Sequence, residues 1–153
     1  MVRINGEIII NRPADAVFEF VADERNEPRY NPRMLRVEKL SPGPIGLGTR
    51  FRTAMTSRPR PAEMTVEWIG YDPPRRLASW THLSTMEIRG ALTFDPVPEG
   101  TRMRWSWVVQ PGGVFKLLTP VLARTGRRQE QRIWANLKRV LEAQAAPSAA
   151  ASR

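Results

Sequence analysis

The chain has 153 residues and a formal net charge of +9, from 24 basic and 15 acidic side chains, with one histidine and no cysteine. This length predicts a single domain with a sizeable core. The lack of cysteine excludes disulfides and thiolate metal sites, and a lone His82 leaves little scope for histidine-based metal or triad chemistry. No apolar run could span a membrane, and the N-terminus lacks the pattern of a signal peptide, so we expect a cytoplasmic protein.

The positive charge raises the question of a nucleic-acid or membrane partner. Only three of the 24 basic residues are lysine, and the arginines are spread along the chain. One local cluster stands out, Arg124, Arg127, Arg128 and Arg132. No phosphate-binding glycine loop or aromatic–basic RNA motif accompanies it, so we expect no nucleic-acid partner and favour a solvated surface. Weak contact of this cluster with anionic membranes remains an alternative.

The first third of the chain predicts a strand followed by two short helices. Residues 2–10 (VRINGEIII) place alternate isoleucines on one face, as a strand does. In NRPADAVFEFVAD, Pro13 suits the first position of a helix whose buried stripe would be Val17, Phe20 and Val21. ERNEPRYNP then predicts a second short helix or turn interrupted by prolines.

The middle of the chain changes to a period of two. Apolar and polar residues alternate in RMLRVEKLS, GTRFRTAMTS, EMTVEWIGYD, LASWTH, MEIRGALTF and TRMRWSWVVQ, with Pro- and Gly-rich turns between most of them. Such alternation predicts about six antiparallel strands, joined by hairpins, with one face covered and the other wet. Arginine and glutamate share the wet face, where cross-strand pairing is a sufficient reason for them.

A long helix is predicted over 119–144, with Thr119 as N-cap and Pro120 in the first turn. The domain would cover 1–145, and the Ala- and Ser-rich tail 146–153 is expected to be disordered. The sequence therefore predicts an α+β architecture, in which a curved antiparallel sheet wraps its apolar face around the terminal helix.

The middle of that helix carries small or polar residues where a buried stripe should be most apolar. Thr125, Gly126 and Gln129 lie in line with Leu122 and Ile133. They face a predicted wall of methionine and tryptophan, which suits a pocket for varied apolar shapes. An ordinary, fully packed core is the alternative. The predicted pocket residues are Phe51, Thr53, Met55, Met64, Val66, Trp68, Met86, Ile88, Met103, Trp105, Trp107, Val121, Thr125, Gln129 and Ile133.

Several motifs resemble one known family. NRPADAVFEFVAD, YNP, IGLGTRFR, YDPPRRLAS and FDPVPEGTRMRWSW, followed by the terminal helix, resemble the polyketide cyclase/dehydrase-like branch of the SRPBCC superfamily, which is related to START domains and the major birch-pollen allergen. The resemblance runs from about Ile4 to Gln144, although Tyr30 stands where such proteins frequently have tryptophan. It implies a helix-grip fold, a seven-stranded antiparallel sheet around the terminal helix with a hydrophobic cavity, and it carries over no catalytic residue.

Two functions follow from these expectations. The first is binding of a lipid, polyketide or aromatic molecule by a carrier or sensor that needs no metal or cofactor, as a monomer or homodimer. The second is a cyclase or dehydratase, which would need an acid or base in the cavity. The predicted inward positions hold no Asp or Glu, so His82 is a weak catalytic candidate. Arg132 would be the best partner for an acidic head group.

Overall fold

The computed structural model describes the backbone of residues 1–151 and the side chains of 1–113 and 116–145. The elements appear in the order that the sequence predicts. They are β1 (Val2–Ile10), α1 (Ala14–Ala22), the 3-10 helix η1 (Glu24–Arg29), β2 (Met34–Lys39), β3 (Arg50–Met55), β4 (Ala62–Asp72), β5 (Arg76–His82), β6 (Met86–Val97), β7 (Gly100–Pro111), a second 3-10 helix η2 (Gly113–Leu118) and α2 (Thr119–Ala151).

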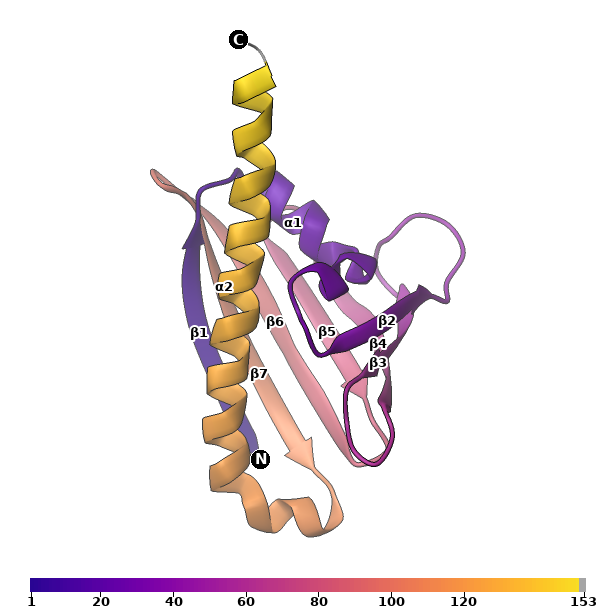
Figure 1. The fold of residues 1–153 in the computed structure, drawn as a ribbon. Helices are drawn as coiled ribbons and strands as arrows, with labels where there is room; N and C mark the ends of the chain where they lie inside the picture. The colour runs from indigo at the N-terminus through magenta and orange to yellow at the C-terminus, as the bar shows by residue number, and fades with distance from the viewer. Residues whose placement is uncertain (152–153) are drawn as a thin grey trace.

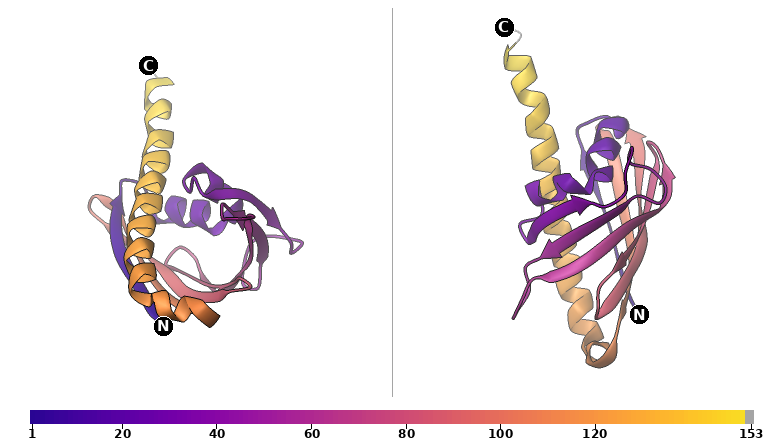
Figure 2. Two further views of the ribbon diagram at one scale, coloured as in Figure 1. Left: turned by 60° about the horizontal axis from the view of Figure 1, so that its bottom comes forward. Right: turned by 90° about the vertical axis from the view of Figure 1, so that its right-hand side faces the viewer.

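The strands form one antiparallel sheet of seven, in the order β1-β7-β6-β5-β4-β3-β2. Each strand from β2 to β7 pairs with its neighbour in the chain, and β1 pairs with β7 along its whole length. The sheet is strongly curved, so its two edges bend toward the same side (Figure 2). The predicted α+β helix-grip fold is confirmed, with α1 and η1 inserted between β1 and β2.

Helix α1 closes one end of the curved sheet (Figure 1). Its buried face is Val17, Phe18 and Val21, so the prediction of Phe20 in this stripe is wrong, because Phe20 is only partly buried. Phe18 packs edge-on against Phe94 with ring centroids 5.4 Å apart. The Trp68 indole on β4 donates a 3.0 Å hydrogen bond to the Ala22 carbonyl, which fixes the end of α1 to the sheet.

Helix α2 packs along β1 rather than over the centre of the concave face (Figure 1). Gly126 allows this approach, since a Cβ at that position would lie 2.5 Å from Cδ1 of Ile4. Farther along, Lys138 Nζ donates to the Ile9 carbonyl at 2.7 Å, and Asn136 Nδ2 donates to the Tyr30 carbonyl at 3.1 Å. These bonds hold the second half of α2 against β1 and η1 and leave much of the concave face uncovered by the helix.

The helix continues to Ala151, beyond the Gln144 expected from the sequence, and extends past the sheet (Figure 1). The last two residues of the tail predicted to be disordered lie outside the described residues. Among the described helices, none is long and apolar enough to cross a membrane.

Candidate ligand-binding site

A cavity of about 490 Å³ lies between the concave face of the sheet, η1 and the middle of α2. Its wall is mostly apolar, and every strand contributes to it, although β2 and β3 contribute one residue each, Met34 and Met55. Ten of the fifteen predicted pocket residues line this cavity, namely Met55, Met64, Val66, Trp68, Met86, Ile88, Trp107, Thr125, Gln129 and Ile133.

The other five predicted residues lie elsewhere. Phe51, Thr53 and Met103 are fully buried in the packed core, and Trp105 is 3% exposed and packs against Trp134 with ring centroids 6.0 Å apart. These four side chains are on the concave face of the sheet, as expected, but they are buried in the core and do not line the cavity. Val121 is 62% exposed, and its neighbour Leu122 lines the cavity in its place, because one residue turns a helix by about 100°.

Gly126 lines the cavity, but its role differs from the predicted one. The missing side chain brings α2 close to β1 at Ile4 instead of leaving empty volume. The open space arises because α2 is held at the β1 side of the sheet.

Three carboxyl groups line the cavity, although none of them is at a position that the sequence predicted to face inward. Glu24 and Glu27 come from η1, and Glu130 comes from α2. We call these three residues the acid end of the cavity. The charge of Glu27 acts on the other two, because it raises the pKa of both Glu24 and Glu130.

Glu24 is the most deeply buried member, with 9% of its surface exposed. Burial raises its pKa well above the ordinary value, and the neighbouring Glu27 raises it further. Its Oε2 is buried without a hydrogen-bond partner among the described residues. Glu27 is held in turn by Asn31, whose Nδ2 donates to Glu27 Oε1 at 2.8 Å. Glu24 is thus a carboxyl that keeps its proton more tightly than usual, beside a second carboxyl that is fixed in place.

Glu130 is held from both sides by indole groups. Trp107 Nε1 from β7 and Trp134 Nε1 from α2 each donate to Glu130 Oε2 at 2.8 Å. Burial raises the pKa of Glu130, while the two indole bonds lower it. Trp107 can lie in this position because β6 offers Gly90 opposite it, where a Cβ would come within 2.5 Å of Trp107 Cε3.

Tyr30 lines the cavity beside the acid end. Its ring packs between those of Phe20 and Trp134, with centroids 6.1 and 5.9 Å away. Burial raises the pKa of its phenol, and the charge of Glu27 raises it further. The acid end therefore sits among aromatic rings in a poorly solvated environment.

One basic side chain lines the cavity, and it is already engaged. Arg33 donates to Gln129 Oε1 at 2.7 Å and to the Thr56 carbonyl at 3.1 Å, which ties the loop after η1 to α2 and to the end of β3. Arg132, expected to meet an acidic head group, is exposed and does not line the cavity. Arg124, Arg127 and Arg128 are exposed as well.

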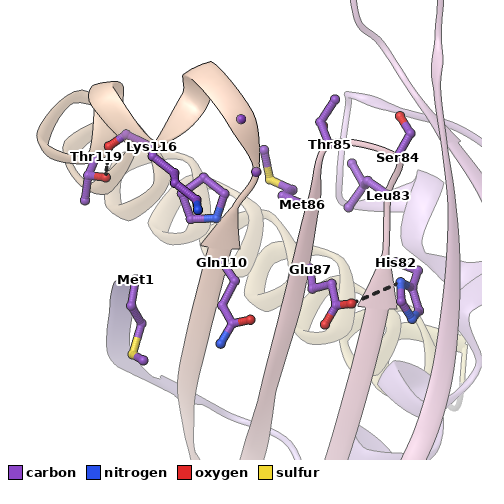
Figure 3. Close-up of a pocket in the computed structure, with 13 residues that line it drawn as sticks. Met1, His82, Leu83, Ser84, Thr85, Met86, Glu87, Gln110, Lys116 and Thr119 are labelled. Carbon is purple, nitrogen blue, oxygen red and sulfur yellow. Dashed lines mark hydrogen bonds and ion pairs between the residues drawn. The ribbon is translucent and has the colours of Figure 1, made fainter.

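His82 lies in a separate, open hollow of about 880 Å³ between the β5–β6 turn and η2 (Figure 3). Its Nδ1 is 3.7 Å from Glu87 Oε1, and its side chain is 43% exposed. The ring also lies against Trp80, with centroids 3.9 Å apart. His82 does not line the internal cavity, so it is not the acid or base that a reaction there would need.

The comparison with family models gives one match, over residues 1–142, to the family described as "Polyketide cyclase / dehydrase and lipid transport". A comparison with curated proteins finds no match.

Solved structures show the same fold at low sequence identity. The protein TTHA0849 from Thermus thermophilus is 18% identical, with a TM-score of 0.76 over 93% of this chain and 98% of that one. The di-domain ARO/CYC BexL from the BE-7585A biosynthetic pathway is 24% identical, with a TM-score of 0.75 over 93% of this chain and 47% of that one. Ara h 8.0201 is 12% identical, with a TM-score of 0.73 over 92% of this chain and 97% of that one.

Proposed function

Because the chain belongs to the polyketide cyclase/dehydrase and lipid transport family, we propose that it binds a hydrophobic small molecule in its cavity, as a carrier or sensor. The observation that carries this proposal is an apolar space that the side chains of the protein leave unfilled. Its volume of about 490 Å³ is that of an ordinary small-molecule pocket.

The cavity wall suits a ligand that is defined by shape more than by a single contact. Met55, Met64 and Met86 are flexible, and Trp68 and Trp107 offer flat apolar area. The charged groups are confined to η1, the loop that follows it and the facing side of α2. A molecule with an apolar body and one polar group therefore fits this arrangement.

The proposal is tested by blocking the cavity from one strand. Thr81 on β5 lines the cavity, so Thr81→Phe should fill part of it. Thr65 on β4 precedes Val66, which is the cross-strand partner of Thr81, so its side chain lies on the opposite face of the sheet. Thr65→Phe therefore serves as the matched control. We expect wild type and Thr65→Phe to retain small molecules in native mass spectrometry and to gain thermal stability with fatty acyl or aromatic ligands. Thr81→Phe should lose both effects, and a wild-type protein that retains and binds nothing would end the proposal.

A second candidate function is catalysis of cyclisation or dehydration in the same cavity. Glu24, whose pKa is raised by burial, is the candidate acid, and Glu130, fixed by two indole groups, is the candidate base. BexL is described as an ARO/CYC protein, and its likeness to this chain supports the fold that such a reaction would use.

The enzyme proposal makes a different prediction from simple binding. A linear aryl poly-β-ketone should be converted to a ring product by wild type, and Glu24→Gln and Glu130→Gln should lower the rate about 100-fold or more. His82→Ala should leave the rate unchanged, since His82 is outside the cavity. Binding of the substrate without turnover would leave the carrier function and reject the enzyme.

A further inference from the structure

We propose that the acid end of the cavity binds the ammonium group of a hydrophobic amine, whose apolar body occupies the methionine- and tryptophan-lined part. This inference rests on the proposed binding function and specifies the class of ligand. It assigns to Glu24, Glu27 and Glu130 a role in recognition.

The first support is charge. The cavity contains three carboxyl groups and one guanidinium, Arg33, and that guanidinium is engaged by Gln129 and a backbone carbonyl. The charge of Glu27 raises the pKa of both Glu24 and Glu130, and none of the ion pairs between described residues includes Glu24, Glu27 or Glu130. Within the described part of the chain the acid end therefore has no ion-pair partner, although the protein as a whole carries +9. A bound cation would remove this repulsion.

The second support is an unused acceptor. Glu24 Oε2 is buried, belongs to a residue that lines the cavity and receives no hydrogen bond from an N–H or hydroxyl group of the described residues, so the side chain within hydrogen-bond reach of Glu24 is another carboxyl, that of Glu27. A buried acceptor without a donor costs free energy, which a ligand N–H would recover. Glu130 offers another acceptor, because both indole bonds end on Oε2 and leave Oε1 outside this arrangement. An ammonium group carries three N–H donors, so it can bond one of these carboxyls and a further acceptor beside it.

The third support is the group of aromatic side chains beside the acid end. Tyr30, Trp107 and Trp134 line the same cavity. Aromatic rings beside carboxylates make a poorly hydrated site. Such a site suits an organic cation better than a cation that keeps its shell of water. Among the residues that the structure describes, no group of three or more His, Asp or Glu side chains has the arrangement to hold a metal ion. These features favour an amine over both a metal ion and the acidic head group for which Arg132 was the candidate partner.

The test compares three probes with the same chain and different head groups, octylamine, 1-octanol and octanoic acid, by calorimetry at pH 7. We expect octylamine to bind about tenfold more tightly than 1-octanol, as one charge-assisted hydrogen bond would provide, and octanoic acid to bind most weakly. Non-specific attraction to a protein of net charge +9 would favour octanoic acid, so a preference for the amine has to arise locally.

Single variants assign the preference to the acid end. Glu130→Gln and Glu24→Gln should each reduce octylamine affinity about tenfold and change 1-octanol affinity much less, and a circular dichroism spectrum like that of wild type shows that each variant is folded. Glu63→Gln is the matched control, because Glu63 is an exposed carboxylate paired with Arg36 on the outer surface. It should change neither affinity.

The outcomes separate this inference from the function on which it rests. If 1-octanol or octanoic acid binds as tightly as octylamine, the cavity binds apolar molecules and the amine preference is wrong. If none of the three probes binds, the amine inference and cavity binding of such chains both fail. An amine preference that persists in both glutamine variants would also overturn the assignment to Glu24 and Glu130.

Discussion

Trp107 on β7 and Trp134 on α2 donate hydrogen bonds of 2.8 Å to the same oxygen atom, Oε2 of Glu130. An indole N–H can only donate, so a buried pair of indoles needs an acceptor between them. The carboxylate provides it and joins the sheet to the helix at the edge of the cavity. A carboxylate that lines the cavity is therefore also part of what holds α2 in place.

Replacing this acceptor should cost stability. Glu130→Ala leaves both indole donors without their partner, and we expect the free energy of unfolding to fall by about 2–4 kcal/mol. Glu130→Gln keeps an oxygen in the same position and should cost about 1 kcal/mol or less. Urea denaturation of the two variants measures the difference, and equal losses would show that the indole bonds contribute little.

The raised pKa of Glu24 predicts a loss of stability as the pH rises. The folded chain holds this proton more tightly than the unfolded chain, whose glutamate titrates near the ordinary value of 4.5. Above that pH the folded state binds more protons, so the free energy of unfolding falls until the folded pKa is passed. Glu24→Gln has no proton to lose and should be more stable than wild type at pH 8, by about 1 kcal/mol or about 2–4 °C.

The same variant should lose its advantage at low pH. Below about pH 4 Glu24 is neutral in both states, so wild type and Glu24→Gln should converge. Asp23 and Glu142 have lowered pKa values and give the opposite trend, but they are present in both proteins and cancel in the difference. A difference that does not change between pH 4 and 8 would contradict the raised pKa of Glu24.

The contact between Gly126 and Ile4 predicts a coupled pair of substitutions. Gly126→Ala adds helix propensity of about 1 kcal/mol but places Cβ against Cδ1 of Ile4, which must move. Ile4→Val removes that Cδ1 atom. We expect Gly126→Ala to be about 1 kcal/mol more favourable in the Ile4→Val background than in wild type. A double-mutant cycle by thermal or urea unfolding gives this coupling, and strict additivity would show that the helix and β1 are not in such close contact.

The basic cluster of α2 predicts weak binding to anionic membranes. Arg124, Arg127 and Arg128 are exposed, and near them Leu117 and Val121 are 85% and 62% exposed. We expect binding to vesicles containing phosphatidylserine that weakens as salt is raised, because each basic residue contributes about 1 kcal/mol near such a surface. Replacing the three arginines by glutamine should weaken vesicle binding about 100-fold.

A control must remove the same charge from another surface. Three arginines on the outer face of the sheet are each exposed and lie near a glutamate, namely Arg36, Arg52 and Arg104. Their triple replacement by glutamine should leave vesicle binding nearly unchanged. Equal losses in the two triple variants would indicate attraction to net charge alone and would remove the assignment to α2.

The wall of the cavity could be predicted from the sequence because a strand alternates strictly. Met64, Val66 and Trp68 follow a period of two, and all three line the cavity. The same rule could not separate Phe51 and Met103 from them, because alternation gives the face of a strand and not the position along it. Where α1 and the second half of α2 cover the sheet, an inward side chain belongs to the core.

The acid end could be predicted only in part. Glu130 precedes Trp134 by four residues, which places both on one face of a helix, and this spacing was the available signal. Glu24 and Glu27 lie in a proline-containing 3-10 helix, where no apolar period indicates which side faces inward. Their position depends on how η1 folds back over the sheet, and that is a tertiary property.

The arrangement around Glu130 gives the unlabelled protein an optical reporter. Two of its five tryptophans are bonded to one carboxylate, so their emission should depend on the field of that group. Arrival of a proton or of a guest molecule at Glu130 changes this field directly. Occupancy of the interior should therefore be readable as a change in intrinsic fluorescence, and Trp107→Phe and Trp134→Phe would divide the signal between the sheet and the helix.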